Sequence, residues 1–160
     1  MVCKILFHGC ICTAYIFCSN LDVVIDSQLS LSAHVAAVCR SGYYQLRQLR
    51  PAVRSLSEYA SKTLVQTFVS CRLDDCNSLL FGISDGLMSR LQSVQNAAAR
   101  LVTGTWHCDY IMPVLHLLRW LLVCQRVDFK VATLVHRLLS GNSASYLADD
   151  CRLVADARER

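Results

Sequence analysis

Between Ser84 and Gly104, apolar residues recur at intervals of four, three, four and three. The series consists of Leu87, Leu91, Val94, Ala98 and Leu101. On a helix with about 3.6 residues per turn, this spacing places all five side chains on one face. Ser84 and Asp85 are suited to cap the start of such a helix, and Gly104 is suited to end it. The segment therefore predicts an amphipathic helix that buries one face in a core.

Four other segments predict helices. They span about 31–50, 56–82, a short stretch after Pro113, and 123–140. Pro51 is expected to end the first, and the capping-box spacing of Ser55 and Glu58 to start the second. Gly82 and Gly141 are expected C-caps of the second and the last. The predicted inward-facing residues are Leu31, Val35, Val38, Gly42, Leu46 and Leu49; Ala60, Leu64, Phe68 and Cys71; and Val123, Val127, Val131, Leu134 and Leu138.

The N-terminal segment predicts short strands. Residues 21–30 contain a β-branched run that ends in Asp26-Ser27, which is typical of a strand followed by a turn. The apolar run before it is interrupted by His8 and Gly9, lacks a small-x-small cleavage site and is shorter than the ~20 residues that span a bilayer. We therefore interpret it as strand and not as a signal or anchor, so neither secretion nor a membrane partner is expected.

A chain of 160 residues is the usual size of one domain. We expect a mainly α fold, an irregular bundle of about five helices with one or two short N-terminal β-strands. The expected boundaries are an apolar leader over 1–20, a helical domain over 21–141 and a polar tail over 142–160.

The composition limits the partners and sites that can be expected of this chain. Hydrophobic residues make up 54% and charged residues 18% of the chain, so either much of it is buried or a surface lacks its usual partner. The net charge of +4 is compatible with a polyanionic partner. The ten cysteines include no C-x2-C pair, so we expect reduced, core-filling thiols in a cytoplasmic or nuclear protein, and no zinc site.

The segment "SYLADDC" carries two adjacent carboxylates, Asp149 and Asp150. A two-metal polymerase site needs such carboxylates on a rigid hairpin, with a further carboxylate from a neighbouring strand. The flanking residues are polar, Leu147 stands where an aromatic would be expected, and no hairpin can be completed downstream. Asp74 and Asp75 lie in a helical pattern. We therefore expect no catalytic residue, no metal site and no cofactor.

Several segments together resemble a known family. "LDVVIDSQLSLSAHVAAVCRSGYYQLRQLRP", "LVQTFVSCRLDDCNSLLFGIS", "LQSVQNAAARLVTG" and "VDFKVATLVHRLLSG…SYLADD" are similar, in this order, to the region after the catalytic palm in reverse transcriptases of LINE-type (non-LTR) retrotransposons, the Jockey-like group especially. The resemblance covers about 21–160. It implies a helical, thumb-like region that helps to hold the template–primer duplex. It also implies no polymerase activity for this chain alone, because the palm lies outside the matched region.

Two basic stripes are candidate nucleic-acid contacts. On a helical wheel, five residues of the first helix cluster opposite its apolar stripe and one more follows Pro51: Arg40, Tyr43, Tyr44, Arg47, Arg50 and Arg54. Arg126, Lys130 and Arg137 share a stripe of the last helix. Guanidinium groups would bind phosphates and rings would stack or pack on sugars of RNA or an RNA–DNA hybrid. A solvated basic face explains the same pattern without a ligand. No small-molecule substrate is expected.

The sequence departs from the family's pattern at three positions: Asp22, Asp75 and Leu122 stand where glycine, tyrosine and proline are usual. An alternative interpretation is therefore a non-functional pseudogene product, or a helical protein-interaction module without nucleic-acid binding. In both cases, apolar faces that would meet the palm are expected to be exposed and to drive association. A third interpretation is membrane association through residues 5–18.

Overall fold

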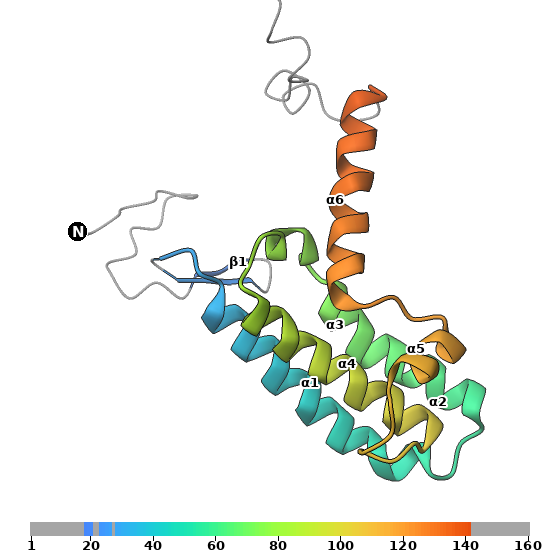
Figure 1. Ribbon diagram of the computed structural model, residues 1–160. Helices are drawn as coiled ribbons and strands as arrows, with labels where there is room; N and C mark the ends of the chain where they lie inside the picture. Colours follow the sequence, from blue (N-terminus) through green and yellow to red (C-terminus); the bar gives the residue numbers. More distant parts are fainter. Residues whose placement is uncertain (1–17, 21–22, 27, 142–160) are drawn as a thin grey trace, which may run out of the picture.

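The computed structural model describes residues 18–20, 23–26 and 28–141, and over this part the chain is mainly α-helical, as expected (Figure 1). Expectations for 1–17 and 142–160, including Asp149 and Asp150, lie outside the described residues. Among the described residues, five helices form an irregular bundle, with one further short 3₁₀ turn. They are α1 (Ser32–Val53), a bent helix made of α2 (Glu58–Val65), η1 (Gln66–Ser70) and α3 (Cys71–Asp74), then α4 (Asp85–Thr103), α5 (Met112–Leu118) and α6 (Val123–Leu139).

A short antiparallel hairpin precedes α1. It joins β1 (Cys18–Asn20) to β2 (Val23–Ile25), with Cys18 opposite Ile25. The second strand confirms the one expected from the β-branched run. Val23 is buried, and the backbone N–H of Val24 donates to His34 Nδ1 at 3.3 Å. The hairpin is thereby attached to the first turn of α1.

The start of α1 agrees with the expected position, but its end does not. Leu31, in the left-handed region (φ 56°), holds the N-cap position. Before it, both the N–H and the hydroxyl of Ser30 donate to Asp26, and Ser30 Oγ accepts the N–H of Ser32. At the other end, α1 continues through Pro51 to Val53. The prediction that Pro51 ends the helix was wrong, since a proline in the last turn removes only one backbone hydrogen bond.

The bent helix starts later than predicted. Ser57 is its N-cap, and its hydroxyl accepts from the N–H of Ala60 at 3.4 Å. Ser55 instead donates its hydroxyl to the carbonyl of Ala52, at the end of α1. The helix ends at Asp74, well before Gly82, and a separate 3₁₀ turn, η2 (Asn77–Leu80), follows.

The buried face of the bent helix also differs from the predicted one. Phe68 and Cys71 are exposed, and the buried residues are Ser61, Val65, Val69, Ser70 and Leu73. Residues four apart drift by about 40° per step on an α-helix, so a 4-4-4 series would leave the core. The π turn of η1 absorbs one extra residue and cancels most of this drift. From the π turn onward, Val69 and Leu73 are buried in place of Phe68 and Cys71. The offset by one residue already exists in α2, before that turn, where Ala60 and Leu64 are half-buried.

The core lies between α1, the bent helix and α4. Leu91, Val94 and Ala98 of α4 are fully buried, as predicted, and Leu87 and Leu101 pack at the edge. Gly42 permits the close approach of α1 and α4, because a Cβ built on it would lie 2.6 Å from Val94 Cγ1. This glycine was predicted on the buried stripe, and the structure shows what its missing side chain accommodates.

Two glutamines of α4 attach the start of α6. Gln95 is buried, and its Nε2 donates to the carbonyl of Leu121 at 2.8 Å. Gln92 donates to Gln95 Oε1 and accepts the N–H of Val123, the first residue of α6, at 2.9 Å. Gln92 thereby satisfies one of the N–H groups that a helix start leaves unpaired, and Gln95 satisfies the carbonyl that precedes the N-cap of α6.

Beyond its first two turns, α6 leaves the bundle (Figure 1). Of the five side chains predicted to face inward, Val123 and Val127 are buried and Val131 and Leu138 are half-buried. Leu134 is exposed, as are its neighbours Val135 and Leu139. Among the described residues, the apolar stripe of α6 therefore extends beyond the part of the helix that packs against the bundle.

Candidate nucleic-acid interface

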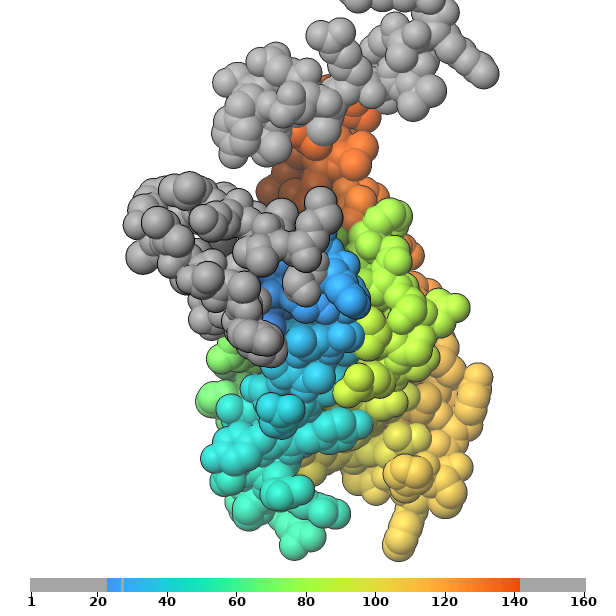
Figure 2. Space-filling model, turned by 90° about the vertical axis from the view of Figure 1, so that its left-hand side faces the viewer, coloured from blue at the N-terminus to red at the C-terminus, as the bar shows by residue number. Residues whose placement is uncertain are grey.

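The basic stripe predicted on α1 lies on the surface. All six side chains are exposed: Arg40, Tyr43, Tyr44, Arg47, Arg50 and Arg54. They lie opposite the buried residues His34, Val35, Cys39, Gly42 and Leu46. Figure 2 views the molecule from a side on which α1, in blue to cyan, forms much of the surface. We call these six residues the α1 basic face.

The α1 basic face has an uncompensated charge along its own helix. Residues 32–53 include three arginines, and none of the 22 residues is an aspartate or a glutamate. Neighbouring like charges on one helix repel each other, which costs a few tenths of a kcal/mol per pair. The arrangement is therefore not explained by stabilisation of α1 itself, whereas a row of phosphates would relieve the repulsion.

Arg90 of α4 is a further cation close to α1. Burial raises the pKa of the Cys39 thiol, and the positive charge of Arg90 acts in the opposite direction, which places Arg90 near Cys39 on α1. Arg90 is exposed. The sequence alone does not point to Arg90, because no pattern within α4 indicates which part of that helix lies beside α1.

Tyr43 contributes a neutral phenol to the face. Its side chain is 46% exposed, and partial burial raises the pKa of the phenol. Tyr44 is more exposed, at 59%. Two rings among arginines suit contact with sugars or bases as well as with phosphates.

The stripe predicted on α6 is divided. Arg126 is largely buried, with 16% of its side chain exposed, and its Nη1 lies 2.9 Å from Asp74 Oδ1. Lys130 and Arg137 are exposed. Arg126 thereby connects α6 to the end of α3, because attraction to the Asp74 carboxylate offsets part of the cost of removing its guanidinium from water.

Burial raises the pKa of Asp74, and Arg126 acts against this rise. Its neighbour Asp75 points to a different partner, Arg72, with 4.0 Å between the charged groups. The two adjacent carboxylates are therefore in separate ion pairs.

The two basic stripes lie apart. α1 packs on α4 and on the bent helix, whereas α6 contacts η2 and α4. Arg50 and Arg54 are near the end of α1 that points away from α6 (Figure 1). A short duplex bound to the C-terminal half of α1 would therefore not contact the stripe of α6.

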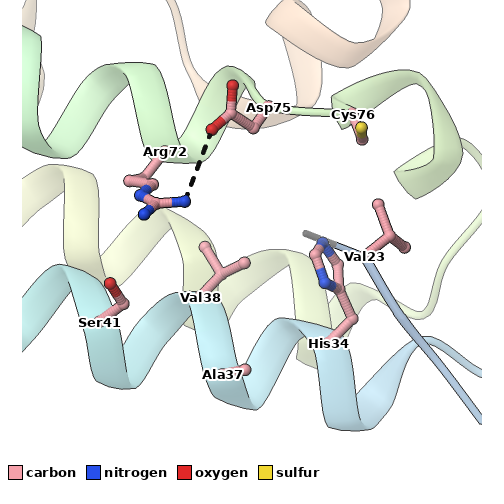
Figure 3. A pocket seen from close by; sticks show the side chains of 8 residues that line it. All are labelled: Val23, His34, Ala37, Val38, Ser41, Arg72, Asp75 and Cys76. Carbon is pink, nitrogen blue, oxygen red and sulfur yellow. Dashed lines mark ion pairs between the residues drawn. The ribbon is translucent and has the colours of Figure 1, made fainter. Parts of the chain in front are cut away.

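A small hollow lies beside the hairpin, with a volume of about 150 Å³ (Figure 3). It is lined by Val23, His34, Ala37, Val38, Ser41, Arg72, Asp75 and Cys76. The ion pair of Arg72 and Asp75 crosses one side, and His34 lies near Val23 on the other. Burial lowers the pKa of His34, so its ring is neutral near pH 7.

Among residues 18–20, 23–26 and 28–141, no three His, Cys, Asp or Glu side chains are grouped so that they could hold a metal ion. None of the helices in the described part of the chain is long and apolar enough to cross a membrane.

Comparisons with protein-family models, with curated proteins and with solved structures give no match to this chain.

Proposed function

We propose that this chain is a thumb-like fragment of a LINE-type reverse transcriptase that binds RNA or an RNA–DNA hybrid through the α1 basic face, without polymerase activity of its own. One observation carries the proposal. The six side chains predicted for this face are all exposed on one side of a helix that contains no acidic residue. The resemblance of the sequence to the post-palm region supports the identity of the ligand.

The expected binding is electrostatic and independent of sequence. Each phosphate neutralised by an arginine releases condensed counterions, so affinity falls as salt concentration rises. Arginine forms paired hydrogen bonds to phosphate oxygens, and this favours it over lysine for such a role. All cations of the α1 basic face are arginines.

The test is a mobility-shift titration with an RNA–DNA hybrid at low and moderate salt. The triple variant Arg40→Glu/Arg47→Glu/Arg50→Glu is expected to lose at least about tenfold in affinity, and the slope of log K against log salt should decrease by about 0.7–0.9 for each phosphate contact removed. Because all three residues are exposed, the fold should be retained.

Single reversals provide the matched control. Arg40→Glu should weaken binding more than Arg119→Glu, which removes an exposed arginine after α5 and changes the net charge equally. Equal affinity of the triple variant and the unmodified chain would contradict the proposal, and equal effects of the two single reversals would reduce it to a general charge effect.

A helical protein-interaction module is the second candidate, favoured by the apolar surface of α6. Leu134 is 40% exposed and Val135 47%. Sedimentation of the purified chain with and without hybrid duplex separates the candidates. Concentration-dependent association that disappears in Leu134→Gln/Val135→Gln, without any binding of duplex, would favour the interaction module.

A further inference from the structure

A groove of about 340 Å³ lies where the first two turns of α6 pass η2. It is lined by Asp74, Asn77, Leu121, Arg126, Phe129 and Lys130. η2 and α6 are in direct contact, and in Figure 1 α6 rises beside the turn that contains η2. The volume is within the range of sites that hold small ligands.

Asn77 is the unusual member of this lining. Only 5% of the residue is exposed, yet its Oδ1 is buried without a hydrogen-bond partner among the described residues. Buried polar atoms are nearly always paired, because an unpaired one forfeits its hydrogen bond to water. Oδ1 has less than 1 Å² of accessible surface, so the Asn77 side chain must turn toward the groove before a ligand N–H can donate to it.

The charges of the groove favour an anion next to that donor. Asp74 is compensated by Arg126 at 2.9 Å, and Lys130 adds a second cation close enough to act on the same carboxyl. Lys130 is exposed and forms no ion pair within the part of the chain that the structure describes. With two cations and one carboxylate, the groove has a formal charge of +1.

Phe129 provides a flat apolar surface on the same groove. Its residue is 68% exposed, although it lies only two positions from the buried Val127. Proteins that bind single-stranded nucleic acids combine a positively charged groove with aromatic side chains on which bases stack. The groove therefore matches a ligand that carries an N–H donor, a flat ring to stack on Phe129 and an anionic group. A nucleotide has all three.

We propose that this groove holds one unpaired nucleotide of a nucleic-acid strand: the base stacks on Phe129, its exocyclic amino group donates to Asn77 Oδ1, and its phosphate lies against Lys130. The inference rests on the proposed nucleic-acid binding and adds a second site to it, away from the α1 basic face. It assigns roles to Asn77 and Phe129, which the sequence patterns did not select.

The experiment measures calorimetric binding of three probes to the full chain. Adenosine 5′-monophosphate carries ring, amino group and phosphate; purine riboside 5′-monophosphate lacks the amino group; ribose 5-phosphate lacks the base. Affinity should fall in this order, with about tenfold lost on removing the base. Equal affinity for the three probes would overturn the inference, since it would mean that only the phosphate is bound.

Variants assign each contact. Phe129→Leu should weaken adenosine monophosphate about tenfold and leave ribose 5-phosphate unchanged, whereas Lys130→Gln should weaken all three probes. Tyr59→Leu is the control, because Tyr59 is an exposed ring (82%) on α2, outside the groove. If Phe129→Leu behaves like Tyr59→Leu, the inference fails.

Asn77→Leu should abolish the preference for adenosine monophosphate over purine riboside monophosphate. Since Asn77 is buried, its variant must retain the helical circular dichroism of the unmodified chain; if it unfolds, Phe129→Leu still decides. Failure here is distinct from failure of the proposed function. If the three probes bind equally, the nucleotide site in the groove is refuted. If binding of the hybrid still depends on Arg40, Arg47 and Arg50, the proposal for the α1 basic face stands.

Discussion

His34 is buried beneath the hairpin, and its ring is held in the neutral form for two physical reasons. Burial lowers its pKa, and Nδ1 accepts the backbone N–H of Val24, which requires that Nδ1 carry no proton. Protonation would remove this acceptor and place a charge where only 5% of the residue is exposed. The hairpin is therefore attached to α1 by a histidine whose pKa lies below its ordinary value.

Stability should consequently decrease as the pH falls below about 6.5. The unfolded chain binds a proton at His34 near its ordinary pKa. The folded chain, whose pKa is lowered, does not, so the loss develops between 6.5 and the lower folded value. Urea unfolding at pH 7.5 and 5.5 measures it. His34→Gln should reduce the difference, while His116→Gln, at an exposed position, should preserve it; the reverse pattern would refute the assignment.

Arg126 illustrates why a charged residue's role is hard to predict. On the helical wheel it belongs with Lys130 and Arg137, but its guanidinium contacts Asp74, 52 positions earlier in the chain. The sequence around Arg126 does not indicate this partner. The residue contributes to attaching α6, and the neighbouring Lys130 remains available to a ligand.

At the scale of elements, the contact between α1 and α4 depends on a missing side chain. Both helices advance in the same direction, since Cys39 lies near Arg90 and Gly42 meets Val94. A glycine inside a helix costs about 0.5–1 kcal/mol relative to alanine, so its presence requires compensation. The close packing of the two helices provides it.

Gly42→Ala should therefore destabilise the protein by about 1–2 kcal/mol despite alanine's higher helix propensity, because the new Cβ overlaps Val94 Cγ1. Gly86→Ala is the matched control. Gly86 lies in α4 with no atom near its would-be Cβ, so stability should be unchanged or higher by about 0.5 kcal/mol. Urea denaturation compares the two variants. The double variant Gly42→Ala/Val94→Ala should be destabilised by less than the sum of the two single effects, because the shortened side chain removes the overlap. Equal effects at both glycines would contradict the packing argument.

At the scale of the whole molecule, stability is expected to be uneven along α6. Its first two turns bury Val123 and Val127 and are attached through Gln92 and Gln95, whereas the rest extends from the bundle. A helix that buries little apolar surface opens locally at low free-energy cost. Hydrogen exchange should therefore be slow near Val127 and fast beyond Leu134.

Gln95→Met should extend the fast-exchanging region to the start of α6 and destabilise the fold by about 1–3 kcal/mol. The substitution preserves volume but leaves the Leu121 carbonyl without its donor. Ser93→Ala, on the exposed side of the same helix, is the control and should change neither quantity. Uniform protection along α6 in the unmodified chain would show that the helix is held by more than these contacts.

Periodicity and caps in the sequence alone predicted the helical class, the bounds of α4 and α6, and the exposure of the α1 basic face. These properties are local: each depends on residues within a few turns of one another, so the spacing of apolar side chains and the position of Ser84 or Gly104 suffices. The resemblance to a reverse transcriptase and the binding of nucleic acid remain predictions.

Other properties depended on contacts between distant segments. Three of them join residues from different elements: the pairing of Arg126 with Asp74, the space that Gly42 leaves for Val94, and the groove at Asn77. The free energy of these contacts comes from packing and desolvation between elements, whereas a helical wheel describes one helix only. Only the tertiary structure could place them, because it alone determines which exposed stripe of a helix meets another part of the chain.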